Sequence, residues 1–340
     1  DWSSDVCSSD LKIKIMKKNL QKVLVLALGL TTTIASAQDF NVDSRTRVNN
    51  TDSEARTAEQ RLTVGASWGG SDWGIHASSD MSYDVANGAT TTSVYEAYVS
   101  TDVMGFGTLT MGRQDLSFGS GALISSNSWG MDRYTNDGMD FSMNMGGFDI
   151  NAGTLNGWDT DNRYINASGE FGGATFNVLM LSNNEADAHG YDLGYSLMGG
   201  DLSLTYSMNS DYDGDEMTAY SATYQVFDNM SATYGNTSYD GAFNMDNTAM
   251  NGGWANGVLG YQAAGSEVTS MGIAYDLGGI NLGYTMYSIT DASDAETEAS
   301  AITLDYSLTD NASIGLAKMG GADAESTWIT ISIRPRSEER

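Results

Sequence analysis

Arginines recur at alternate positions near the start of an otherwise acidic chain. Arg45 and Arg47 are two residues apart, and Arg61 follows in the next extended segment. In a β-strand, residues two apart point to the same face of the sheet. The spacing therefore predicts that three guanidinium groups share one wall, together with the polar side chains of Asn41 and Asp43.

Acidic residues on the same inward face occur in later predicted strands. Asp80, Glu96 and Asp140 each fall on the polar face of an alternating pattern. If basic and acidic walls face each other across water, they impose a transverse field that orients a charged solute. Salt bridges that only stiffen the sheet are the alternative interpretation, and the spacing alone does not separate the two.

A long connection at 114–136 is the best candidate for a segment that narrows an enclosed space. It contains small residues together with Leu123, Ile124 and Trp129, a composition too apolar for a loop surrounded by water. If the segment folds inward, Arg113 and Arg133 would edge the narrowest point. If it folds outward, it would be a lid or a subunit contact.

Other groups that could carry chemistry are few. Asp211, Asp213 and Asp215 form an acidic run, but Glu216 and Ala222 stand where an EF-hand needs Gly and Glu. A weak divalent-cation site in acidic loops therefore stands beside the interpretation as a solvated loop. The sequence predicts no other cofactor and no zinc site, nucleotide loop or cysteine nucleophile.

The two histidines give little support to an enzyme. His76 lies in a predicted strand with its side chain on the polar face, and His189 begins a strand near a long connection. A hydrolase would need a histidine beside a serine or an acid at the rim. An outer-membrane hydrolase that uses His189 is therefore kept only as an alternative.

The elements that must position these residues are strands. In the segment 201–209, Leu202, Leu204, Tyr206 and Met208 alternate with Ser, Thr and Asn, and 137–145 and 301–308 repeat the pattern. Strict alternation over this length is typical of strands with one apolar and one polar face. The residues after the signal segment contain no convincing helical pattern.

Short Gly- or Asn-bearing turns and long polar connections alternate along the chain, which predicts a series of hairpins. Counting on that scheme gives eighteen strands, within a range of 16–20. The predicted ranges are about 40–50, 58–68, 73–84, 93–103, 107–113, 137–145, 148–155, 161–171, 174–182, 189–198, 201–209, 215–226, 229–238, 267–276, 279–289, 298–308, 311–319 and 326–334. The main uncertainty is 239–266, where GVLGYQAA has the composition of a further hairpin arm.

These strands fit a transmembrane barrel better than a soluble sandwich. Their lengths are near the roughly 9–11 residues of a tilted membrane strand, and Lys318 is the sole lysine from residue 38 to residue 335. Soluble sheets usually protect their edges with lysine and proline, whereas a closed barrel has no edges. Aromatic residues beside the short turns, such as Trp68, Trp73 and Phe171, are typical of an interfacial girdle. The fold class predicted is all-β, an antiparallel transmembrane barrel with short periplasmic turns and long extracellular loops.

Both ends of the 340-residue chain differ from the rest. Residues 1–15, with the sole cysteine, Cys7, and residues 336–340 are interpreted as adaptor-derived or out-of-gene segments. Residues 16–37 have a basic start, an apolar stretch VLVLALGL and a small-residue Ala35-Ser36-Ala37 site, as in a cleaved signal peptide. Residues 38–335 are predicted to form a single barrel domain that is exported.

Charge excludes one class of partner. Residues 38–335 hold nine of the 16 basic residues and 39 of the 44 acidic ones, an excess of 30 negative charges. Such a field repels a phosphate backbone, so nucleic-acid binding is not expected. The partners predicted are outer-membrane lipid, lipopolysaccharide and small hydrophilic solutes, with a homotrimer or a monomer left open.

At this point the residues resemble a known family. FGTLTMGRQ at 106–114 is similar to the strand before the constriction loop of Gram-negative porins, and the following SFGSGALISSNSWGMDRYTNDGMDF is similar to the eighteen-stranded alginate-export type. The resemblance implies a passive channel in the outer membrane of a Gram-negative bacterium, with selectivity set by lumen charge and an inward loop. An acidic saccharide is its most specific implied solute. A structural or adhesive surface protein is the alternative of another class.

Overall fold

The computed structural model describes residues 39–51, 56–85, 87–128, 130–131, 133–156, 161–251, 259–321 and 325–334. The predicted signal peptide at 16–37, the suspected adaptor segments 1–15 and 336–340, and Trp129 all lie outside the described residues. Within the described part, no helix has the length and apolar character needed to cross a membrane.

Across the ranges just given, the regular structure is eighteen strands and a 3₁₀ turn, η1, at Met198–Gly200. In order they are β1 (Asp39–Asn49), β2 (Ala58–Gly69), β3 (Trp73–Asp84), β4 (Thr90–Asp102), β5 (Thr108–Gln114), β6 (Asn136–Met145), β7 (Phe148–Thr154), β8 (Arg163–Phe171), β9 (Ala174–Ser182), β10 (Asp187–Leu197), β11 (Leu202–Ser210), β12 (Glu216–Phe227), β13 (Met230–Asp240), β14 (Glu267–Asp276), β15 (Ile280–Thr290), β16 (Glu296–Thr309), β17 (Ala312–Gly321) and β18 (Ser326–Ile333).

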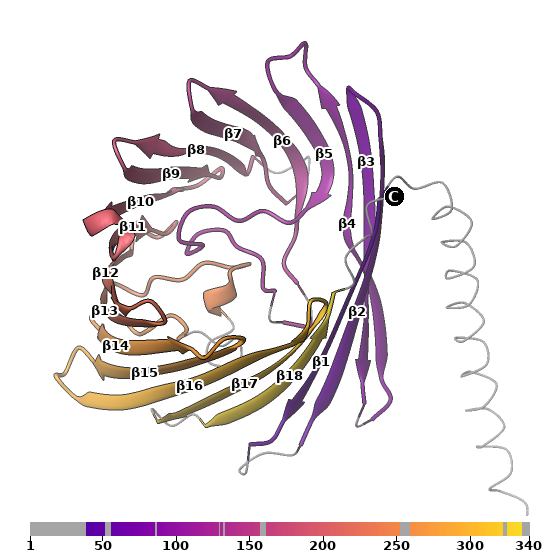
Figure 1. The fold of residues 1–340 in the computed structure, drawn as a ribbon. Helices are drawn as coiled ribbons and strands as arrows, with labels where there is room; N and C mark the ends of the chain where they lie inside the picture. Colours follow the sequence, from indigo (N-terminus) through magenta and orange to yellow (C-terminus); the bar gives the residue numbers. More distant parts are fainter. Residues whose placement is uncertain are drawn as a thin grey trace, which may run out of the picture.

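The strands close into one antiparallel barrel (Figure 1). Each strand pairs with its neighbours in sequence, and β1 pairs with β18 to complete the ring, with Arg45 opposite Ser332. Closure gives every strand two partners, so no row of backbone N–H and C=O groups is left open to lipid. The predicted fold class and strand number are confirmed.

Period-two alternation sorts the side chains onto two faces. On β10, Tyr191, Leu193 and Tyr195 are 39%, 55% and 43% exposed, whereas Asp192 between them accepts a hydrogen bond from a segment inside the barrel. Large apolar side chains that are this exposed belong to the face that meets lipid. The opposite face encloses the lumen, as the alternation predicts.

Tight turns close one rim of the barrel. The turn between β6 and β7 uses Gly146 and Gly147 at φ values of 65° and 91°, a region that glycine enters without steric cost. Trp73, Phe171 and Phe227 beside such turns are 49%, 77% and 64% exposed. This arrangement is the aromatic girdle expected at a membrane interface.

Two long connections lie inside the barrel instead of above it (Figure 1). One joins β5 to β6, and the other joins β13 to β14. They pack against a buried cluster that includes Leu123, Ile124, Phe243 and Met245. The described part of 241–266 contains no strand, so the further hairpin arm considered for 239–266 is not formed there. Its apolar residues instead fill the lumen.

Replacing an outward side chain by arginine tests the assignment of the faces. Leu193→Arg on the lipid face is expected to destabilise the barrel by about 2–4 kcal/mol, because a charge near the bilayer midplane loses its hydration. Urea unfolding in lipid vesicles measures the change. Thr205→Arg, on the exposed polar face of β11, is the matched control and should change stability little. Equal losses for both variants would contradict the assignment.

Candidate functional site: the constricted lumen

The segment between β5 and β6 is bound to the β1–β2 wall through its backbone. The Arg45 guanidinium donates to the carbonyl oxygens of Ser128 and Gly130 at 2.6 and 2.8 Å, and Arg61 donates to Gly130 at 2.6 Å. Arg45 and Arg61 are register partners on adjacent strands, and they are 6% and 2% exposed. Both predicted lumen arginines therefore position the inward segment.

Arg133, on the segment itself, supplies a second attachment. Its guanidinium forms an ion pair with Asp80 at 2.6 Å and donates to the Thr63 hydroxyl at 3.0 Å. It also lies 3.2 Å from the centre of the Tyr95 ring, a cation–π contact. Because Asp80 and Arg133 are both nearly buried, the pair is screened little by salt and fixes this end of the segment.

The start of the segment is held by β4. The backbone N–H of Asp115 donates to the Glu96 carboxylate at 3.2 Å, and the Tyr95 hydroxyl donates to the Asp115 carboxylate at 2.5 Å. Glu96 is also 3.6 Å from Nε2 of His76, whose Nδ1 lies 2.8 Å from the Ser67 hydroxyl. The predicted lumen acid Glu96 is thus part of a polar network that joins three strands.

The far side of the barrel holds the middle of the segment. Asp192 on β10 accepts a hydrogen bond from the backbone N–H of Ser120 at 3.1 Å. Just beyond, Leu123 and Ile124 are 2% and 5% exposed and pack into the buried cluster. The segment therefore crosses the lumen from one wall to the other, which settles the direction left open by the sequence: it folds inward.

The connection between β13 and β14 binds the segment between β5 and β6. The Tyr261 hydroxyl donates to the Ala122 carbonyl at 2.9 Å, and the Ala249 N–H donates to the Ser125 hydroxyl at 3.0 Å. Phe243, 1% exposed, packs in the same cluster. Sequence reasoning missed this role. The apolar residues of this long connection were its signal, and the only role considered for them was a further hairpin arm at GVLGYQAA.

The remaining predicted lumen residues differ in position. Arg47 forms an ion pair with Glu59 at 2.7 Å and lies 4.7 Å from the Trp328 ring centre, at the β1 wall. Asp140 accepts hydrogen bonds from Tyr164 and Asn151 inside the barrel. These two residues share the lumen with Arg45 and Arg61.

Arg113 does not share the lumen with them. Strand alternation places it on the same outward face as Met111, where it forms an ion pair with Asp137 at 2.7 Å. Sequence reasoning placed Arg113 at the constriction because the long loop begins beside it. Alternation with Leu109 and Met111 on the same strand already assigns Arg113 to the apolar face, so the signal was present in the sequence.

The acidic run at 211–215 shapes a loop. The Asp211 carboxylate accepts hydrogen bonds from the backbone N–H groups of Asp213 and Asp215 at 3.0 Å and of Asn244 at 2.9 Å. In the described part of the chain, no group of three or more His, Cys, Asp or Glu side chains is arranged to hold a metal ion. His189 packs edge-on against Tyr191 on the outward face of β10, so it does not meet the lumen.

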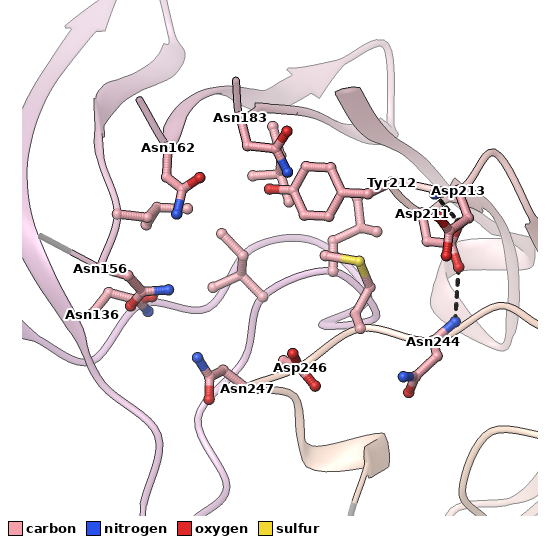
Figure 2. A pocket seen from close by; sticks show the side chains of 15 residues that line it. Asn136, Asn156, Asn162, Asn183, Asp211, Tyr212, Asp213, Asn244, Asp246 and Asn247 are labelled. Carbon is pink, nitrogen blue, oxygen red and sulfur yellow. Dashed lines mark hydrogen bonds between the residues drawn. The ribbon is translucent and has the colours of Figure 1, made fainter. Parts of the chain in front are cut away.

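Two cavities lie on opposite sides of the inward segments. One, of about 460 Å³, lies among the ends of the long connections (Figure 2). It is lined by asparagine side chains, such as Asn156 and Asn244, and by apolar residues that include Leu123. The other, of about 360 Å³, lies between Ser128 and the wall of β16–β18 and is lined by Arg45, Asp305 and Arg334. A solute crossing the barrel would meet amides first and charged groups second.

The comparisons with known proteins agree with this arrangement. The family model of the Gram-negative porins matches residues 24–320. The structure is similar to Pseudomonas aeruginosa OccK5 (OpdH), with a TM-score of 0.72, 12% identity, and 87% of this chain and 98% of that chain covered. It is also similar to P. aeruginosa OpdK determined with vanillate (TM-score 0.69, 12% identity, 87% and 98% covered). Acinetobacter baumannii OccAB4 is another such structure (TM-score 0.67, 11% identity, 87% and 97% covered). No curated protein matches the sequence significantly.

A closed eighteen-stranded barrel crossed by an inward segment is the architecture of an outer-membrane diffusion channel. Because the family model covers most of the sequence, the chain belongs to the Gram-negative porin family. It is an outer-membrane channel for small solutes and not an enzyme, so the adhesive and hydrolase alternatives are set aside. The finer likeness to the alginate-export type stays a prediction.

A glycine at the tip of the segment tests its docking. Gly119 has φ +55°, and a Cβ added there would overlap the Asp192 carboxylate. Gly119→Ala is therefore expected to push the segment away from β10 and raise single-channel conductance. Gly88→Ala is the matched control, because Gly88 has φ +74° with open space around it. Unchanged conductance in Gly119→Ala, with Asp192 intact, would contradict the docking.

Proposed function

We propose that the segment 115–135 forms the constriction of this porin, and that the arginines beside it make the channel favour small anionic solutes. The observation that carries the proposal is that Arg45 lines the cavity between Ser128 and the β16–β18 wall and lies directly beside the segment. Asp305 lines the same cavity, as does Arg334, which forms an ion pair with Asp43 at 2.6 Å. A solute entering this space exchanges water for protein groups, so the local charges act on it strongly.

The acidity of the whole chain favours the opposite selectivity at the entrance. Residues 38–335 carry an excess of 30 negative charges, which predicts a cation-leaning mouth. Exposed charges are screened over about 8 Å at physiological ionic strength. Selectivity is therefore expected to follow the groups at the narrowest point, where Arg45 lies, and not the acidic loops.

Salt bridges that stiffen the lumen account for part of the charge pattern. Arg133 with Asp80, and Arg47 with Glu59, are close ion pairs. Arg45 and Arg61 also position the segment, since their guanidinium groups donate to the backbone carbonyls of Ser128 and Gly130. Positioning and charge selection by Arg45 therefore need separate tests.

Substituting Arg45 separates charge from positioning. Arg45→Gln keeps an amide N–H for the segment carbonyls but removes the charge, so the chloride-to-potassium permeability ratio is expected to fall by a few-fold. Arg45→Lys keeps the charge and should retain the ratio. Reversal potentials in planar bilayers under a salt gradient measure both. Equal ratios in the wild type and Arg45→Gln would contradict charge selection by this residue.

A similar structure and the family resemblance each indicate a solute to test first. Vanillate, present with P. aeruginosa OpdK, is a carboxylate. It makes an aromatic carboxylate a suitable first anion for this channel. The acidic saccharide implied by the resemblance to the alginate-export type is the second. Uptake of either by porin-loaded vesicles, compared with an uncharged analogue, tests whether anionic charge speeds entry.

Contacts outside the lumen are also part of the proposal. The acidic connections at 183–188 and 290–297 lie at the long-loop rim, where divalent cations would link them to lipopolysaccharide phosphates. Removal of divalent cations with EDTA is expected to release bound lipopolysaccharide from the purified barrel. A homotrimer stays a prediction, and light scattering in detergent distinguishes it from a monomer.

A further inference from the structure

The larger cavity at the long-loop end has an unusual lining. Six of its fifteen lining residues are asparagines, which come from four separate connections or strand ends. They are Asn136, Asn156, Asn162, Asn183, Asn244 and Asn247. Figure 2 shows amide groups on both sides of the cavity. Its volume of about 460 Å³ is in the range of small-molecule sites.

Most of these amides have unused hydrogen-bonding capacity. Among the described residues, the side chains of Asn136, Asn156, Asn162, Asn244 and Asn247 form no hydrogen bond with the protein. The Oδ1 atom of Asn183 does, since it accepts the N–H groups of Glu185 and Ala186. Each free amide offers two donors and one acceptor oxygen. The cavity therefore presents paired donors and acceptors to whatever enters it.

Two of the amides are held by unusual backbone geometry. Asn156 and Asn247 have φ values of +55° and +58°, where a side chain is uncommon and asparagine is enriched. Glycine would fit this conformation more easily. The chain thus carries an amide at two turns where the backbone alone needs none, and both amides line the cavity.

The charges that line the cavity disfavour anions and attract cations only weakly. None of its fifteen lining residues is basic. The Asp211 carboxylate is engaged by three backbone N–H groups, which leaves Asp213 and Asp246 as carboxylates near the opening. Both are exposed to solvent, so their attraction for a cation is screened.

The floor and side of the cavity are apolar. Leu123, Ile124 and Leu181 line it and are buried. Tyr212 also lines it, with its ring beside the amides (Figure 2). Burial, with the nearby Asp187 carboxylate, raises the pKa of the Tyr212 phenol, so its hydroxyl stays neutral. A ring with polar edges and an apolar face would match this lining: its hydroxyls to the amides and its C–H face to the floor.

We infer that this cavity is a binding site for an uncharged saccharide, which it holds at the long-loop end before passage. The inference rests on the proposed channel function, because a bound sugar would then stand above the constriction. The amides recognise the hydroxyl groups, and the charge selection proposed for Arg45 acts separately, at the second cavity.

Sugar-induced current fluctuations test the inference. Sucrose is added to the solution on the long-loop side of a single wild-type channel in a planar bilayer. We expect brief, concentration-dependent interruptions of the ion current. Asn156→Gly and Asn247→Gly remove an amide while keeping the left-handed backbone. Each should weaken sucrose binding by about threefold to tenfold, the loss of one or two neutral hydrogen bonds.

Controls separate this inference from the proposed function. Asn281→Gly removes an amide at the short-turn end and should leave sucrose binding unchanged. Glucuronate and putrescine at equal concentration should interrupt the current less than sucrose does. An open channel that sucrose does not affect, or that putrescine blocks more strongly, overturns the saccharide site and leaves the channel intact. A barrel that conducts no ions refutes the channel function itself.

Discussion

Every other property of this protein depends on the closure of its backbone hydrogen-bonding ring. Because β1 pairs with β18, all eighteen strands have two partners, and the outer surface can be apolar without unsatisfied N–H and C=O groups. Closure also fixes which side chains share the interior. Arg45 and Arg61 meet as register partners on adjacent strands, so one point on the wall presents two guanidinium groups to the segment that crosses the lumen.

A ring of this width does not fill itself with side chains. The space is divided instead by two connections that enter it and bind each other. Arginine donors on one wall, an aspartate acceptor on the other and an apolar cluster between them hold the crossing segment. The charged groups that hold the segment in position therefore lie in the same part of the lumen where they would act on a solute. The cost of burying them is offset by the backbone carbonyls and carboxylates they contact.

The alternation of side chains determined most of the fold, and strand boundaries follow it closely. Side-chain faces were predictable where pairing is regular, as for Arg45, Asp80 and Asp140. The outward face of Arg113 also follows from its alternation with Met111, and the nearness of the long loop obscured it. A register shift such as the one between Ala77 and Ser79, where β3 pairs with β4, cannot be read from composition. The direction of a long connection was equally unreadable. Phe243 and Tyr261 carry the signal that 241–266 is buried, but the same residues would also suit a strand.

The two inward segments share hydrogen bonds, from Tyr261 to Ala122 and from Ala249 to Ser125. The two segments are therefore joined inside the barrel. A displacement of the β13–β14 connection would act on the β5–β6 segment through these four residues, so the width of the pore depends on a connection that follows eight strands later.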